Sequence, residues 1–195
     1  MKINIPNVLT IFRILLTPLF IICLFYENKY ARIWALFIFI VASITDAIDG
    51  YYARKYNQVT RHGKFLDPLA DKILVSSAFI SFAIMKLVPF WMVVLIIFRD
   101  LFVTGLRMAM ESKGLTMITS KIAKAKTTTQ ISVIIFILLF LSIQIFSYSW
   151  LREIIDFILV NRIIYYIALL ATGFTIWTGI SYLYKNRLII KNFLT

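Results

Sequence analysis

Residues 46–71 read DAIDGYYARKYNQVTRHGKFLDPLAD and hold four of the nine acidic residues of this 195-residue chain. Asp46 and Asp49 are three positions apart, and Asp67 and Asp71 are four apart, so each pair falls on one face of a helix. A loop of roughly a dozen residues allows the two helices to pack as antiparallel neighbours. The stretch therefore predicts a helical fold in which four carboxylates meet.

The chain around this stretch is predominantly apolar, with 61% hydrophobic residues and a mean hydropathy of +0.87. Continuous apolar runs recur along it, which is typical of a polytopic helical membrane protein, because backbone groups in lipid must be paired within their own segment. We expect an all-α fold and one transmembrane catalytic domain over residues 1–195. Residues 151–160 are predicted to be interfacial. Six transmembrane helices are predicted at residues 8–25, 33–51, 67–86, 89–110, 122–146 and 163–184.

Basic residues are distributed unevenly about these spans. When residues near span ends are counted with the adjoining side, three of the 21 Lys and Arg residues lie within spans and 13 lie on the side of residues 46–71. Only five lie on the other side, which are Lys29, Arg32, Lys86, Arg152 and Arg162. The positive-inside rule therefore predicts that both termini and the acidic stretch face the cytoplasm. The net charge of +12 fits this topology and anionic headgroups, whereas a nucleic-acid role is not expected because no soluble basic domain is present.

The four carboxylates indicate a metal site for phosphate chemistry. Carboxylates are costly near hydrocarbon and often mark function there, and four in one place repel unless a divalent cation intervenes. Oxygen ligands favour Mg²⁺ or Mn²⁺, and four carboxylates suffice for two ions about 3.5–4 Å apart, as in phosphoryl transfer. Arg54 offers a planar cation for a diphosphate, while Gly50 and Gly63 leave room for a ligand. Two separate interhelical salt bridges are the alternative interpretation.

The same residues resemble the signature of the CDP-alcohol phosphotransferases, D-x-x-D-G-x-x-A-R, eight residues, then G-x-x-x-D-x-x-x-D. Residues 4–13, 98–107 and 123–127 are similar to the bacterial phosphatidylglycerophosphate synthase branch, which usually has Glu and Gly where Asp100 and Ala123 stand. The resemblance implies a six-helix bundle of that family, a homodimer, and a place in the bacterial inner membrane. It also implies transfer of the phosphatidyl group of CDP-diacylglycerol to glycerol 3-phosphate, with release of CMP.

The resemblance further implies roles for individual residues. Asp46, Asp49 and Asp67 would bind one metal ion, and Asp46, Asp67 and Asp71 the second, with Asp71 also the general base. The residues expected to bind CDP-diacylglycerol are Asn7, Thr10, Gly50, Arg54, Thr60 and Gly63. The acceptor carries a phosphate and needs a second anion site. Its candidates are Arg107, Lys124 and Lys126, for each of which contact with lipid headgroups is the alternative.

Three further charges lie inside predicted spans. Arg99 and Asp100 are adjacent and project about 100° apart on a helix, so direct pairing between them is not expected. Either could face a cavity, where Arg99 could pair with an Asp of the acidic stretch or contact the substrate. A structural buried polar network is the alternative. The same interpretations apply to Arg13, for which snorkelling to the cytoplasmic headgroups is the simplest expectation.

Two other functions remain as alternatives. The same chemistry could use another alcohol, namely inositol phosphate, serine or phosphatidylglycerol, because the signature does not specify the acceptor. A divalent-cation transporter is more remote, since such proteins commonly show inverted repeats and no repeat is visible here.

Replacing the predicted base tests the chemistry directly. Asp71→Asn should keep part of the binding of metal and CDP-lipid, because the other three carboxylates remain. Release of CMP should fall by at least about 100-fold, since the variant cannot accept the proton of the attacking hydroxyl. Substantial CMP release by this variant would contradict the assignment of the base.

Overall fold

The computed structural model describes the backbone of residues 5–28, 30–55, 63–115 and 121–194, and the side chains in these ranges except 5–10, 46–55, 63–71, 121–124, 192 and 194. The described residues are helical and contain no strand, as expected. The helices are α1 (Ile5–Phe25), α2 (Ala31–Lys55), α3 (Gly63–Ile84), α4 (Phe90–Ser112), α5 (Lys121–Ile143), α6 (Ser149–Val160), α7 (Ile163–Lys185) and α8 (Arg187–Leu194).

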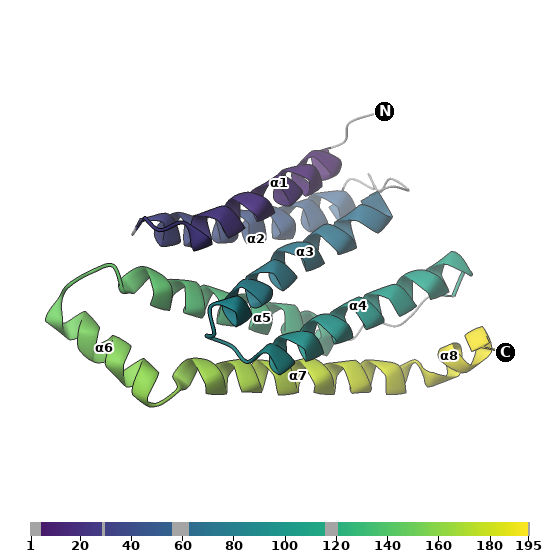
Figure 1. Ribbon diagram of the computed structural model, residues 1–195. Helices are drawn as coiled ribbons and strands as arrows, with labels where there is room; N and C mark the ends of the chain where they lie inside the picture. Colours follow the sequence, from purple (N-terminus) through teal and green to yellow (C-terminus); the bar gives the residue numbers. More distant parts are fainter. Residues whose placement is uncertain (1–4, 29, 56–62, 116–120, 195) are drawn as a thin grey trace.

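The long helices form one bundle made of two groups of three. Helix α1 packs on α2 and α3, while α7 packs on α4 and α5 (Figure 1). Contacts of α3 with α4, and of α5 with α2 and α3, join the two groups. The end of α2, the start of α3, the end of α4 and α8 lie toward the same end of the bundle, at the right in Figure 1. The two halves of the acidic signature therefore lie on helix segments at one end.

Two helix ends show why the chain turns where it does. At the end of α3, the Leu87 N–H donates to Phe82 O at 2.9 Å and the Lys86 N–H donates to Ala83 O at 3.0 Å, which is the Schellman pattern. Lys86 takes the left-handed conformation that this pattern requires, with φ 59°. Pro89 then precedes α4 as its N-cap. This connection sends α4 back beside α3.

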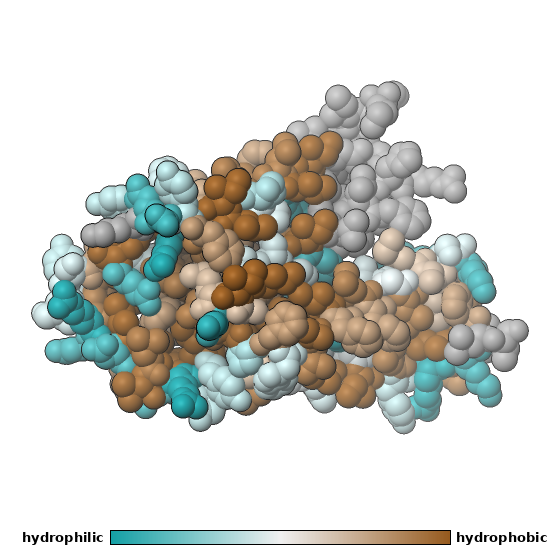
Figure 2. All heavy atoms as spheres, viewed as in Figure 1, coloured by the Kyte–Doolittle hydropathy of each residue, from teal (hydrophilic) through white to brown (hydrophobic). Residues whose placement is uncertain are grey.

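The interior of the bundle is a close-packed apolar core. Phe20, Phe39, Phe79, Phe82 and Ile137 are fully buried and belong to one cluster that joins both groups of helices. The rings of Phe20 and Phe39 lie 5.7 Å apart between α1 and α2. Apolar residues also cover most of the outer face visible in Figure 2, with hydrophilic side chains mainly toward the two ends of the bundle. Apolar surface on both sides of the helices is the pattern expected in lipid.

Two segments of the described residues are each long and apolar enough to cross a membrane, Ala125–Ile143 and Ile163–Lys185. Shorter apolar helical stretches are Ile11–Phe25, Ala31–Thr45 and Lys72–Ile84. These findings support the all-α membrane class, and six spans remain a prediction.

The helix bounds differ from the expected spans where polar residues lie. Helix α2 continues to Lys55 and α3 already begins at Gly63, because polar residues at a membrane surface still form backbone hydrogen bonds along a helix. The predicted interfacial segment is the amphipathic helix α6. Helix α8 was not predicted, and its eight residues are too few for periodicity to reveal.

Substitutions of Phe79 and Ile80, which are consecutive residues on α3, test which face of this helix packs into the core. Phe79→Ala should lower the free energy of unfolding in detergent micelles by about 3 kcal/mol, because its fully buried ring leaves a cavity. Ile80→Ala should change it by less than about 1 kcal/mol, since Ile80 is 42% exposed and loses few contacts. Equal losses in the two variants would show that the α3 face is assigned wrongly.

Candidate functional site

The acidic signature lies on regular helix, as its spacing predicts. Asp46 and Asp49 belong to α2, and Asp67 and Asp71 belong to α3, so each pair is on one helix face. Their side chains lie outside the described ones, as do those of Asn7, Thr10, Gly50, Arg54, Gly63 and Lys124; Thr60 lies outside the described residues entirely. Among the side chains that are described, no three His, Cys, Asp or Glu residues come together. The metal site therefore remains a prediction.

The packing of α1 against α2 places a buried arginine at the level of this signature. Phe20 and Phe39 face each other across the two antiparallel helices. Arg13 lies seven residues before Phe20 and Asp46 lies seven residues after Phe39, so the two positions are level along the helices. Arg13 is only 1% exposed, and the expectation that it snorkels to headgroups is wrong. Helix α1, which carries Arg13, packs on both α2 and α3, and periodicity alone does not reveal which neighbours a helix acquires.

The candidates for the acceptor phosphate have different surroundings. Arg107 is about half exposed, and its Nε donates to Glu111 Oε1 on the same helix at 2.8 Å. Lys126 is buried, and its Nζ on α5 donates to Asp100 Oδ1 on α4 at 2.5 Å. Lys72 lies close enough to Lys126 for their charges to repel. Because Lys72 follows Asp71 on α3, Lys126 lies near the second acidic pair.

Asp100 is the centre of a buried polar network. Its Oδ1 also accepts a hydrogen bond from Arg99 Nη1 at 3.2 Å, so these neighbours pair directly, contrary to expectation. The long guanidinium side chain bends back to the carboxylate, which the 100° angle between Cβ directions does not prevent. Arg99 Nη2 donates to Thr178 Oγ1 on α7 at 3.3 Å. A buried polar network is therefore present here, as one of the two interpretations of these charges expects.

Residues of α7 that sequence reasoning did not identify complete the network. Gln130 Nε2 on α5 donates to Thr175 Oγ1 at 3.3 Å, and the Thr178 hydroxyl donates to Thr175 O at 2.8 Å. A Cβ atom on Gly179 would lie 2.9 Å from Arg99 Nε, so the glycine makes room for the arginine. The available signal was the spacing of Thr175, Thr178 and Gly179, small or polar residues on one face of an apolar helix.

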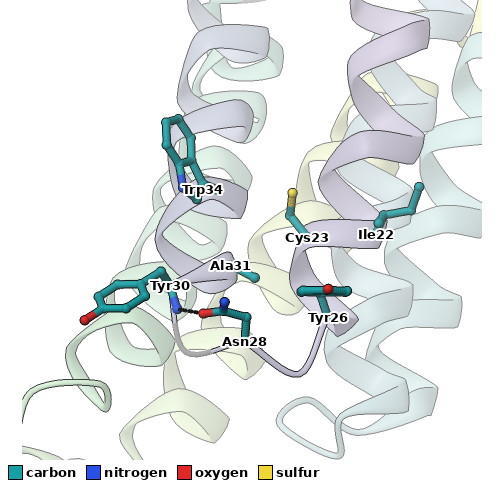
Figure 3. Close-up of a pocket in the computed structure, with 7 residues that line it drawn as sticks. All are labelled: Ile22, Cys23, Tyr26, Asn28, Tyr30, Ala31 and Trp34. Carbon is teal, nitrogen blue, oxygen red and sulfur yellow. Dashed lines mark hydrogen bonds between the residues drawn. The ribbon is translucent and has the colours of Figure 1, made fainter.

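A separate cavity of about 340 Å³ lies at the opposite end of α1 and α2. Figure 3 shows Tyr26, Tyr30 and Trp34 around it, with the Tyr30 N–H donating to Asn28 Oδ1 at 3.0 Å. Among the described residues, its lining includes none that is acidic or basic. Aromatic residues at helix ends are typical of a membrane–water interface, so this cavity has the character of a lipid boundary and not of a site for phosphate chemistry.

Comparison with known proteins agrees with the signature. Residues 3–178 match the family model described as CDP-alcohol phosphatidyltransferase. A Rickettsia bellii protein named CDP-diacylglycerol–glycerol-3-phosphate 3-phosphatidyltransferase is 40% identical over 179 residues, 92% of this chain and 93% of that relative. The Bacillus subtilis protein of the same name is 44% identical over 140 residues, 66% of this chain and 72% of that relative. A probable phosphatidylglycerophosphate synthase of Mycobacterium tuberculosis is 43% identical over 114 residues, covering 57% and 54%.

Two glycines of α7 form a matched pair that tests the contact with Arg99. Gly179→Ala should lower the free energy of unfolding in micelles by about 1–3 kcal/mol, because the added methyl group collides with the arginine side chain. Gly173→Ala should leave stability equal or slightly higher, since nothing lies within 4 Å of a Cβ there and alanine favours helix. Destabilisation by Gly173→Ala alone would contradict the described packing.

Proposed function

This chain belongs to the CDP-alcohol phosphatidyltransferase family, and we propose that it transfers the phosphatidyl group of CDP-diacylglycerol to glycerol 3-phosphate, forming phosphatidylglycerophosphate and CMP. The observation that carries this proposal is the 40% identity to the Rickettsia bellii protein, which is named CDP-diacylglycerol–glycerol-3-phosphate 3-phosphatidyltransferase. The match covers 93% of that relative. The complete acidic signature on α2 and α3 supports it, because the transfer of a phosphate-linked group needs concentrated carboxylates to hold cations.

The donor set fits two divalent cations. The two acidic pairs supply only oxygen ligands, each pair on one face of a regular helix, and both helices pack against α1. Asp46, Asp49 and Asp67 would hold one Mg²⁺ or Mn²⁺ ion, and Asp46, Asp67 and Asp71 the other. When bound, such ions neutralise the charge of a diphosphate.

The residues of the chain would then carry the remaining steps. The guanidinium of Arg54 binds the diphosphate of the CDP moiety. The other proposed contacts of the CDP moiety are Asn7, Thr10, Gly50, Thr60 and Gly63. The primary hydroxyl oxygen of glycerol 3-phosphate attacks the β-phosphorus, and its proton passes to the Asp71 carboxylate. The bond from that phosphorus to the bridging oxygen breaks, and CMP leaves. This direct displacement needs no covalent intermediate on the protein.

The phosphate of the acceptor would bind at the cationic ends of α4 and α5. Arg107, Lys124 and Lys126 are the proposed contacts. Proximity of Lys126 to Lys72, the residue after Asp71, supports a phosphate site beside the proposed base. Three cations on two neighbouring helix segments suit a dianionic phosphate better than a neutral alcohol.

We also propose the arrangement of the chain in the membrane. The six long helices contain 21 to 25 residues, or about 32–38 Å at 1.5 Å per residue, which is enough to cross a hydrocarbon core of about 30 Å. The excess of Lys and Arg near the acidic signature supports a site facing the cytoplasm. The membrane would be the bacterial inner membrane, as the bacterial relatives suggest, and the assembly a homodimer.

A panel of acceptors tests the proposal. Purified protein with labelled CDP-diacylglycerol should release CMP with glycerol 3-phosphate at least about 100-fold faster than with serine, inositol phosphate or phosphatidylglycerol. Chelation with EDTA should abolish release, and Mg²⁺ or Mn²⁺ should restore it.

Each alternative has its own outcome in this assay. Faster CMP release with another alcohol would leave the proposed phosphatidyl transfer in place but would make that alcohol the acceptor. Undiminished CMP release in EDTA would remove the metal ions from the proposal. Flux of divalent metal into liposomes without any CMP release would favour a transporter.

A further inference from the structure

The buried network at Asp100 contains more positive charge than a structural tie needs. Asp100 and Lys126 have side chains only 3% exposed, and that of Arg99 is 13% exposed. Among the described side chains, one carboxylate thus faces two cations, and we call these three residues the charge cluster. Burying an ionised group among apolar helices is costly unless an opposite charge compensates it. A single Arg–Asp or Lys–Asp pair would join the helices without the excess.

The charge cluster also has unused hydrogen-bond donors. An ammonium has three donors and a guanidinium five. The described contacts of Lys126 use one, to Asp100, and those of Arg99 use two, to Asp100 and Thr178. Arg99 Nε is buried and has no hydrogen-bond partner within the described part of the chain. Excess positive charge together with spare donors suits an anion with several oxygen acceptors, such as a phosphate.

The position of the charge cluster indicates which substrate would supply a phosphate to it. Lys126 interacts electrostatically with Lys72, which follows the proposed base Asp71, and α3 packs on both α4 and α5. A phosphate held here would place an attached hydroxyl group near that base. The acceptor alcohol of the proposed reaction carries both groups on one small molecule.

Resting on the proposed function, we propose that Asp100 is a positioning residue that holds Lys126 and Arg99 together as a preformed cationic site for the phosphate of glycerol 3-phosphate. Asp100 does not touch the acceptor. Its Oδ1 fixes the Lys126 ammonium and the Arg99 guanidinium before the acceptor arrives, so that binding need not order two long side chains. Thr178 and Gly179 on α7 hold the guanidinium from the other side.

The test compares Asp100→Asn, Asp100→Glu and Asp156→Asn in the full-length protein. Asp156 is an exposed carboxylate on α6. Asp156→Asn therefore serves as the control, because it makes the same Asp-to-Asn change away from the charge cluster. Release of CMP is measured while glycerol 3-phosphate and CDP-diacylglycerol are varied in turn. Asp100→Asn should raise KM for glycerol 3-phosphate at least about tenfold, and KM for CDP-diacylglycerol less than about twofold.

The other two variants should behave differently from Asp100→Asn. Asp100→Glu keeps the charge and should stay within about threefold of the unmodified protein in both constants. Asp156→Asn should match the unmodified protein. Inorganic phosphate should inhibit competitively against glycerol 3-phosphate, and this inhibition should weaken about tenfold in Asp100→Asn. This second readout reports on the phosphate alone.

Several outcomes overturn the proposal. Unchanged KM for glycerol 3-phosphate in Asp100→Asn, with only a lower unfolding temperature, would leave the charge cluster a structural tie. If KM for glycerol 3-phosphate and KM for CDP-diacylglycerol rose in parallel, the charge cluster would instead act on the phosphate of the lipid substrate. If Asp100→Asn does not fold, Thr178→Val loses one contact to Arg99 and should raise KM for glycerol 3-phosphate about threefold, and no change would count against the proposal.

Failure of the proposed function has a separate signature. The unmodified protein would then release no CMP with glycerol 3-phosphate, whatever the variants do. Normal activity of the unmodified protein with unaltered kinetics in Asp100→Asn removes only the positioning role.

Discussion

The cost of placing an ionised side chain among apolar helices organises this bundle. An ion that leaves water requires an opposite charge and well-aligned donors, and water is excluded where α4, α5 and α7 meet. Asp100 meets this requirement for Lys126 and Arg99 with a single carboxylate oxygen. The contact ties α4 to α5, and the bond from Arg99 to Thr178 adds α7. One acidic residue thus links three helices that also pack through apolar contacts.

Small residues allow the helices to approach closely enough for these contacts. Ala35 and Ala42 on α2 and Ala78 on α3 are completely buried in the apolar core, and Gly179 admits the Arg99 side chain against α7. In lipid the helices gain little from hiding apolar surface, so shape complementarity and polar contacts hold them together. The two groups of helices seen in Figure 1 are joined by the shared apolar core and by a hydrogen bond from the Ser142 hydroxyl on α5 to Arg32 O on α2 at 3.4 Å.

The same end of the bundle collects the features expected of catalysis. The acidic signature lies on α2 and α3, Arg13 is buried at its level on α1, and Lys126 lies beside the start of α3 through its proximity to Lys72. Positions of both charge signs thus lie toward this end, while the far end carries the aromatic cavity and a second cavity of about 450 Å³ whose lining includes Glu27 and Arg32.

The sequence by itself determined the helical class, the long helices to within a few residues, the place of each Asp pair on a regular helix, and the family, because these depend on local spacing and on matching residues. It predicted neither the burial of Arg13 nor the pairing of Arg99 with Asp100. Both depend on which helices become neighbours and on how a long flexible side chain bends, and only the tertiary structure decided them. Residues distant in sequence, such as Asp100, Lys126 and Thr178, acquire partners only when packing brings their helices together, and the free energy of a buried charge depends on those partners.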